Sequence, residues 1–123
     1  MSLRARVSYV KQIDKGEGVS YGLLWQAPVR TVIATVPLGY ADGVPRRLSG
    51  ADVMVNGQPR PIAGAVTMDQ LMVDCGPDSD VSVGDEVVLL GDGITAWDWA
   101  GRLGSIAYEV VCGISERVPR IYA

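Results

Sequence analysis

The side chains able to move protons in this chain are of a restricted kind. None of its 123 residues is histidine. The usual Ser-His-Asp and Cys-His nucleophiles and the usual zinc sites all need histidine, so we expect neither these catalytic classes nor a metal site. Acid–base chemistry would therefore fall to Tyr, Asp, Glu, Lys or Cys side chains.

We expect such side chains to be exposed to a ligand in polar stretches of the sequence, several of which contain glycine. Tyr21 lies in one of them, and because a free tyrosine has a pKa near about 10, it needs a neighbouring donor or positive charge to act as a base. The alternative for Tyr21 is an ordinary strand residue whose hydroxyl hydrogen-bonds to water. The alternative for Tyr40 is a residue that covers a tight turn stabilised by Asp42. The polar stretches are Gly18–Gly22, Pro37–Gly43, Met68–Gln70 and Ala107–Val110.

Short strands separated by turn residues must position these stretches, a pattern typical of a small barrel or sandwich. The clearest is a hairpin of Ala51–Val55 and Gln58–Ile62, because Asn56-Gly57 between them suits the positive φ angles of a type I′ turn. Pro37–Gly43 reads as a loop. The other expected strands are Arg4–Ile13, Val19–Trp25, Thr31–Val36, Gln70–Cys75, Glu86–Leu90 and Val118–Tyr122.

Helical signals are confined to the C-terminal part of the chain. Thr95 and Asp98 resemble a capping box that opens a helix over Ala96–Leu103, and Ser105 is placed to cap a second short helix through Val111. We predict a mostly β fold, a small β-barrel or sandwich-like domain with one or two short helices near the C-terminus. With residues 1–3 set aside as an expression leader, one domain over residues 4–123 is expected.

Composition indicates a soluble, folded protein. Hydrophobic residues make up 48% and charged residues 20%. The net charge of −3 argues against a nucleic-acid partner, which clustered Lys and Arg would bind. The sequence has neither a signal peptide nor an apolar run of about 20 residues, so we expect a cytoplasmic protein without a membrane partner. Cys75 and Cys112 are expected to be buried thiols, a disulfide being the alternative.

The polar stretches and the closing Ile114–Arg120, in this order and spacing, resemble the C-terminal domain of alanine racemase. That family uses pyridoxal 5′-phosphate (PLP) to interconvert L- and D-alanine. The resemblance covers roughly Arg6 to Tyr122. It implies an N-terminal (β/α) barrel, absent here, that carries the cofactor lysine, and a head-to-tail homodimer whose active sites combine one barrel with the partner's β domain. Neither Lys11 nor Lys15 matches that lysine, so the chain alone is expected to be inactive.

The resemblance also assigns roles to individual residues. It implies that Tyr21 is the catalytic base opposite the cofactor lysine and that Met68 holds the substrate carboxylate through its backbone amide. Met68 as core filler, with Asp69 at a turn, is the alternative. The further roles it implies are substrate binding for Tyr40, Asp69 and Arg46, the substrate corridor for Ile106 and Arg46, and the cofactor phosphate for Tyr108.

Two positions depart from the family pattern. Ala65 stands where many relatives have arginine, and the loss of that arginine is expected to weaken the polar layer of the corridor. Thr67 stands where cysteine is common. Three other functions stay open from the sequence. They are a broader-specificity amino-acid racemase, a free-standing β-barrel binding module, and a domain that serves only dimerisation.

Overall fold

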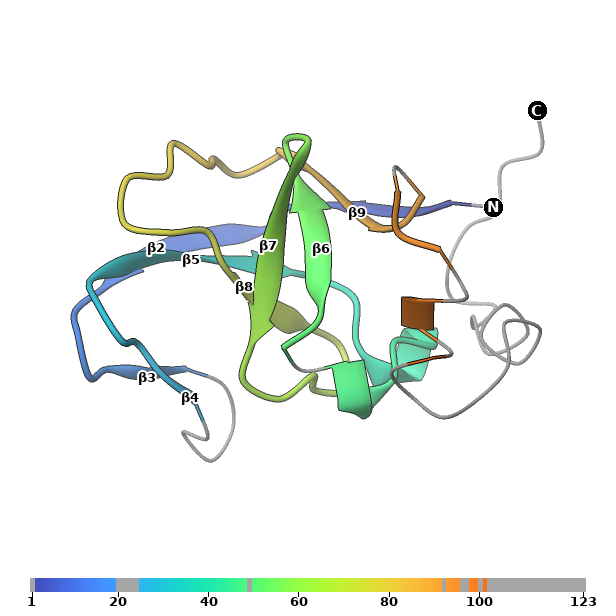
Figure 1. Cartoon of the computed structure of the whole chain (residues 1–123), viewed down its shortest axis with the longest axis horizontal. Helices are drawn as coiled ribbons and strands as arrows, with labels where there is room; N and C mark the ends of the chain where they lie inside the picture. The colour runs from blue at the N-terminus through green and yellow to red at the C-terminus, as the bar shows by residue number, and fades with distance from the viewer. Residues whose placement is uncertain are drawn as a thin grey trace.

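The computed structural model describes residues 2–19, 25–48, 50–91, 93–95, 98–99 and 101 of the chain. Short antiparallel strands dominate this part, as the sequence predicts (Figure 1). Two 3-10 turns follow the fifth strand. In chain order the elements are β1 (Leu3–Arg6), β2 (Tyr9–Ile13), β3 (Gly18–Val19), β4 (Trp25–Gln26), β5 (Thr31–Val36), η2 (Tyr40–Asp42), η3 (Arg46–Leu48), β6 (Asp52–Val55), β7 (Gln58–Ala63), β8 (Leu71–Asp74) and β9 (Glu86–Leu90).

Seven of the described strands form one curled sheet in the order β1-β9-β6-β7-β8-β5-β2, while β3 pairs with β4. The two edge strands, β1 and β2, follow each other in the chain (Figure 1). The Val7 N–H donates to the Asp85 carbonyl at 2.9 Å, and the Ser8 N–H donates to the Thr35 carbonyl at 2.9 Å. Asp85 precedes β9 and Thr35 lies in β5, the strands next to the two edges, so two consecutive residues reach opposite sides of the sheet and the sheet must bend round on itself. The mostly β, barrel-like fold is confirmed.

Strand β5 is the centre of the core. All six of its residues are buried. Val32, Ala34 and Val36 belong to the main apolar cluster, whereas Ile33 packs in a second cluster with Ile13 and Ala63. Successive side chains of a strand point to opposite faces, so β5 is covered on both. Because β5 is packed on both faces, its last residue, Val36, holds the start of the following loop in a defined position.

The hairpin of β6 and β7 is the clearest confirmed prediction. Val55 pairs with Gln58, which leaves a two-residue turn between the strands. Asn56 has a φ of 50° and Gly57 a φ of 79°. These positive angles are those a type I′ turn requires, which is why the sequence pair Asn-Gly marks the turn.

Two predictions at the N-terminus need correction. The expected strand Arg4–Ile13 is two strands, because the chain leaves one sheet edge and joins the other at Val7 and Ser8. Leu3, set aside with the leader, is buried, begins β1 and pairs with Leu90, so it belongs to the fold. A third prediction, the single strand Val19–Trp25, is also wrong, because Val19 of β3 and Trp25 of β4 are antiparallel partners and the chain must reverse between them. Residues 20–24 lie outside the described part.

The predicted helix cap at Thr95 is confirmed. The Thr95 N–H donates to the Asp98 carboxylate at 2.7 Å, and the Asp98 N–H donates to the Thr95 hydroxyl at 3.1 Å. Residues 98, 99 and 101 are helical, and Trp99 is buried in the main cluster. The second predicted helix and the strand Val118–Tyr122 fall outside the described residues.

Cys75 is a free, buried thiol, as expected. Burial raises its pKa to about 11, although the positive charge of Arg60 acts in the opposite direction. A protonated, enclosed thiol is a poor nucleophile, so Cys75 is a packing residue. Cys112 lies outside the described residues.

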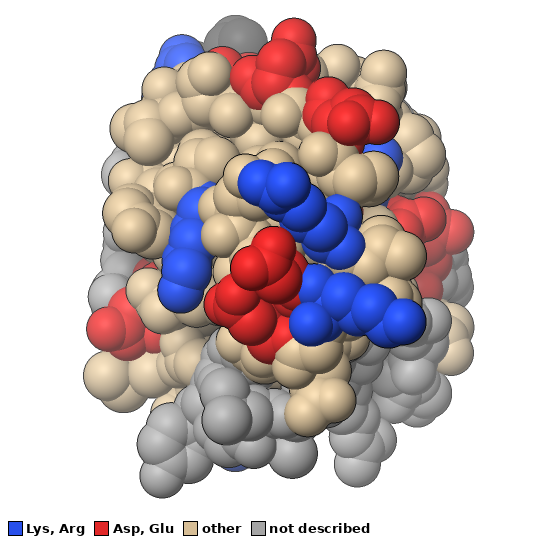
Figure 2. Space-filling view, turned by 90° about the vertical axis from the view of Figure 1, so that its left-hand side faces the viewer, with Lys and Arg blue, Asp and Glu red and all other residues tan. Residues whose placement is uncertain are grey.

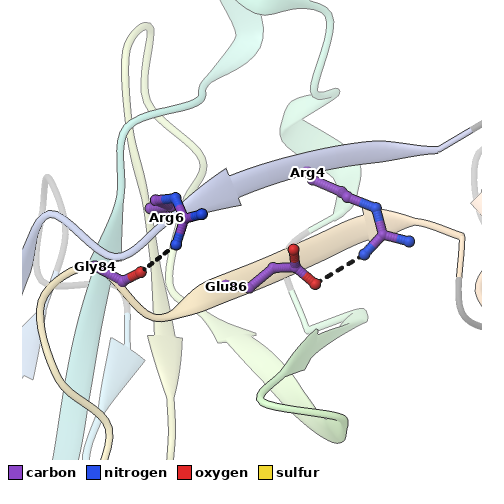
Figure 3. Close-up of polar contacts among 4 residues, drawn as sticks. All are labelled: Arg4, Arg6, Gly84 and Glu86. Atoms are coloured by element: carbon purple, nitrogen blue, oxygen red, sulfur yellow. Dashed lines mark hydrogen bonds and ion pairs between the residues drawn. The ribbon is translucent and has the colours of Figure 1, made fainter. Parts of the chain in front are cut away.

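Charge on the described surface is mixed. In Figure 2, Lys and Arg side chains surround acidic ones in the middle of the face shown. At the edge formed by β1 and β9, Arg4 pairs with Glu86 at 2.8 Å, and Arg6 donates to the Gly84 carbonyl at 2.9 Å (Figure 3). Such exposed pairs add little stability, but charged side chains on an edge strand hinder pairing with other chains. Over the described ranges, no helix has the length and apolar character needed to cross a membrane.

Candidate functional site

Two loops at the same end of the sheet carry three of the predicted substrate-site residues, Tyr40, Met68 and Asp69. One loop, residues 37–43, follows β5, and the other, residues 67–70, precedes β8. Val36 and Leu71 are partners in the antiparallel pair of β5 and β8. The sheet therefore delivers both loops to one place, and we call them together the loop pair.

The loop pair is joined backbone to backbone. The Tyr40 N–H donates to the Thr67 carbonyl at 2.9 Å, and the Ala41 N–H donates to the Met68 carbonyl at 3.0 Å. A Cβ atom on Gly39 would lie 2.2 Å from the Thr67 carbonyl oxygen and 2.5 Å from the Met68 carbonyl carbon. Glycine is needed at position 39 because another backbone passes against it.

The first loop is shaped by a buried carboxylate. The Gly39 N–H donates to Asp42 Oδ2 at 3.0 Å, and the Asp42 N–H donates back to the Gly39 carbonyl at 3.0 Å. Gly43 then ends η2 with a φ of 102°, and its N–H donates to the Tyr40 carbonyl at 3.1 Å. Asp42 is thus the turn-stabilising residue that the sequence predicts, although its burial was not foreseen.

The second loop is closed by Thr67, one of the two residues that depart from the family pattern. The Thr67 hydroxyl donates to the Gln70 carbonyl at 2.9 Å and accepts from the Gln70 N–H at 3.3 Å. The Thr67 N–H also donates to the Gln70 carbonyl, at 2.9 Å. The missed signal is local, because a threonine three residues before the end of a loop often bonds to nearby backbone in this way.

The loop pair displays apolar surface beside groups that favour an anion. Tyr40 is 46% exposed and Met68 51% exposed, so the alternative of Met68 as core filler is wrong. Arg46 Cζ lies 5.7 Å from the centre of the Tyr40 ring, a cation–π distance. Within the described part of the chain, the Met68 N–H donates no hydrogen bond. A guanidinium and an available amide beside apolar side chains suit a small carboxylate ligand.

Some of the predicted site residues lie at the loop pair, and others lie outside the described part of the chain. The structure brings Tyr40, Arg46 and Met68 to the loop pair, and the exposed Asp69 follows Met68 in the second loop. The predicted site residues outside the described part are Tyr21, Ile106 and Tyr108.

A hollow in another part of the described surface contains none of the predicted site residues. It has a volume of about 620 Å³ between the β6–β7 hairpin and the loop after β8, with Asn56, Arg60 and Asp78 among its lining. Its walls carry both signs of charge and show no convergence on one ligand chemistry. Among the described residues, no group of three Cys, Asp or Glu side chains is arranged to hold a metal ion.

Known proteins resemble this chain over almost its whole length. The alanine racemase of Cutibacterium acnes is 49% identical over 127 residues, covering 99% of this chain and 34% of that protein. The solved alanine racemase of Enterococcus faecalis matches with a TM-score of 0.94 at 41% identity, covering 99% of this chain and 33% of that one. The Bacillus anthracis alanine racemase, solved with bound L-Ala-P, has a TM-score of 0.93 at 44% identity over 99% of this chain and 32% of that one.

The chain therefore spans about a third of the length of these relatives. The family model described as "Alanine racemase, C-terminal domain" matches residues 1–122. This chain belongs to the alanine racemase C-terminal domain family.

Proposed function

We propose that this chain acts as the C-terminal domain of a PLP-dependent alanine racemase and supplies one wall of its active site. The observation that carries the proposal is the loop pair itself, in which the backbone of Met68, whose N–H donates no hydrogen bond in the described part of the chain, is joined to the loop of Tyr40, the ring that Arg46 contacts. The relatives, about three times as long, are alanine racemases. The missing two thirds would supply the barrel and the cofactor lysine.

The two lysines of this chain do not suit the cofactor. Lys11 lies in the middle of β2, and Lys15 lies in the turn after it. That turn follows Ile13, which pairs with Thr31 at the opposite end of β5 from the loop pair. The cofactor lysine must therefore come from another part of the protein, in agreement with the barrel expected from the family. PLP, when bound, supplies an electron sink that eases loss of the Cα proton.

Substrate binding falls to the loop pair. The Met68 amide and the Arg46 guanidinium both favour the carboxylate of alanine, and Asp69 shapes the loop beside them. Tyr40 narrows the site, so that a methyl side chain fits better than a larger one. Tyr108 is assigned to the cofactor phosphate and Ile106 to the substrate corridor, both by the family resemblance.

Tyr21 is assigned to proton transfer. Racemisation removes a proton from one face of Cα and delivers another to the opposite face, so a base is needed on each side. We assign the cofactor lysine to one face and Tyr21 to the other. Because the chain has no histidine, the group that lowers the pKa of Tyr21 must be an arginine or come from the barrel.

The assembly we propose is a homodimer in which each β domain serves the partner's barrel. L- and D-alanine are the small-molecule ligands. We place the protein in the cytoplasm, where the free thiol of Cys75 would stay reduced.

The test is a chimera in which this chain replaces the matching C-terminal third of the Cutibacterium acnes racemase. Conversion of L- to D-alanine is measured with PLP present. We expect an active enzyme in which Tyr21→Phe reduces kcat in both directions by about 10²–10⁴-fold. Tyr9→Phe, at the exposed tyrosine that begins β2, is the matched control and should retain activity.

Hydrogen exchange at Cα separates the two bases. In Tyr21→Phe the lysine still serves one face, so exchange with solvent should persist for one enantiomer without inversion. Equal loss of exchange from both enantiomers would contradict the assignment of Tyr21. A correctly folded dimeric chimera without any racemase activity would contradict the proposed function and favour an independent binding module.

A further inference from the structure

Asp42 is a buried carboxylate that the proposed chemistry does not use. Its side chain is 5% exposed at the base of the loop pair. Burying a carboxylate is costly unless hydrogen bonds compensate it, and the Gly39 N–H provides one at 3.0 Å. An apolar residue would avoid this cost, so the buried acceptor oxygen at position 42 is expected to have a specific task.

The contacts of Asp42 lead directly to the joint between the loops. The Asp42 carboxylate accepts a hydrogen bond from the Gly39 N–H. The Gly39 carbonyl in turn accepts hydrogen bonds from the N–H groups of Asp42 at 3.0 Å and Val44 at 3.2 Å. Gly39 is thus held on both sides. The next two N–H groups, of Tyr40 and Ala41, are the ones that bond to the second loop.

We propose that Asp42 is a positioning residue for substrate binding. Its carboxylate orients Gly39 so that the first loop docks on the Thr67–Met68 backbone, and this docking sets the spacing between the Tyr40 side chain and the Met68 amide. The inference rests on the proposed function, in which those two groups bind the substrate. The proposed function assigns proton transfer to Tyr21 and the cofactor lysine, and only substrate binding to the loop pair, so loss of the Asp42 acceptor should raise KM more than it lowers kcat.

Asp42→Ala removes the acceptor for the Gly39 N–H, and Asp42→Asn keeps an oxygen that can accept it. Asp74 offers a matched control at the opposite end of β8. Its Oδ1 also accepts a backbone hydrogen bond, from Gly76 at 3.1 Å, and a hydroxyl hydrogen bond from Thr31. Asp74→Ala should therefore destabilise the domain by a similar mechanism without disturbing the loop pair.

The first measurement is amide hydrogen exchange in this chain, followed by NMR. In Asp42→Ala we expect the amides of Tyr40 and Ala41 to exchange at least about 10-fold faster than in the unmodified chain, since opening of the joint exposes both. In Asp42→Asn and in Asp74→Ala these two amides should keep their protection. Protection of both amides in Asp42→Ala would overturn the proposal whatever the activity.

The second measurement is steady-state kinetics in the chimera. We expect Asp42→Ala to raise KM for alanine by about 10–100-fold, because a misplacement near 1 Å can cost roughly 10²-fold. Asp42→Asn should restore KM to within a factor of about three, and Asp74→Ala should leave it unchanged. Equal KM increases in Asp42→Ala and Asp74→Ala would reduce Asp42 to a stabilising residue and overturn its positioning role.

The failure of this inference is distinguishable from that of the proposed function. An inactive unmodified chimera would contradict the proposed function and the substrate role of Asp42 together, whereas an active one with an unchanged KM in Asp42→Ala contradicts Asp42 alone. If Asp42→Ala does not fold, Asp42→Leu, which has a similarly branched side chain without an acceptor oxygen, takes its place with the same expected results.

Discussion

Replacing Gly39 by alanine tests whether backbone contact holds the loop pair together. Gly39 has a φ of −143° and a ψ of −162°, an extended conformation that alanine adopts without strain. The cost must therefore come from the new Cβ, which would lie 2.2 Å from the Thr67 carbonyl oxygen. Ordinary contact between such atoms requires the two loops to move apart by roughly 1 Å.

The magnitude follows from what this movement breaks. The hydrogen bonds from Tyr40 and Ala41, now 2.9 and 3.0 Å long, would both stretch well beyond the normal limit of about 3.2 Å. Their loss costs about 1–3 kcal/mol together. If the loops stay in place instead, overpacking strain costs a similar amount, about 1–3 kcal/mol. Either response should lower the free energy of unfolding by about 2 kcal/mol.

Urea unfolding of this chain measures the effect, and Gly101→Ala is the control. A Cβ on Gly101 would meet nothing within 4 Å, and the residue is helical, so alanine there should be neutral or stabilising by up to about 1 kcal/mol. In the chimera, Gly39→Ala should also reduce kcat/KM by about 10²-fold. A Gly39→Ala chain within about 0.5 kcal/mol of the unmodified one, where harmless substitutions fall, would refute the close-contact explanation.

Two further predictions concern stability. Thr67→Val removes both hydroxyl hydrogen bonds to Gln70 and should cost about 1 kcal/mol in urea unfolding, whereas Thr67→Ser should cost less; equal losses would contradict the role of the hydroxyl. Burial raises the pKa of Cys75 from 9.0 to about 11, so the unfolded chain loses this proton first as the pH rises. The stabilising effect of the proton is full below pH 9 and is lost toward pH 11. Unfolding from pH 8 to 10.5 should therefore show a steeper decline for the unmodified chain than for Cys75→Ala, and parallel declines would contradict it.

Features of the fold that depend on neighbouring residues could be predicted from the sequence. The turn at Asn56-Gly57 and the cap formed by Thr95 and Asp98 each involve residues within three positions of each other. The break at Val7 could not be predicted, because it results from the meeting of two sheet edges and has no glycine or proline to mark it. The burial of Leu3 likewise depends on β9, far along the chain.

The candidate site divides in the same way. The stretches around Tyr40 and Met68 could be identified by motif, but their direct contact depends on the register of β5 and β8. The need for glycine at position 39 comes from a backbone 28 residues away, which no local pattern reveals. The bonding of Thr67 to Gln70 is predictable from the sequence, because the two residues are three positions apart, whereas a comparison with the family pattern shows only that cysteine is replaced there.

The joining of the two sheet edges has a consequence for how the protein is made. Among the described strands, β1 pairs with β9, and Arg4 and Glu86 are 82 positions apart. At synthesis rates of about 5–20 residues per second, β1 waits roughly 4–16 s for that partner to be translated. Such distant pairing also carries a large loop-closure entropy, so closure should come late in folding. The arginines at positions 4 and 6 therefore protect the newly made strand from the wrong neighbours during this interval, before they take part in any pair of the finished sheet.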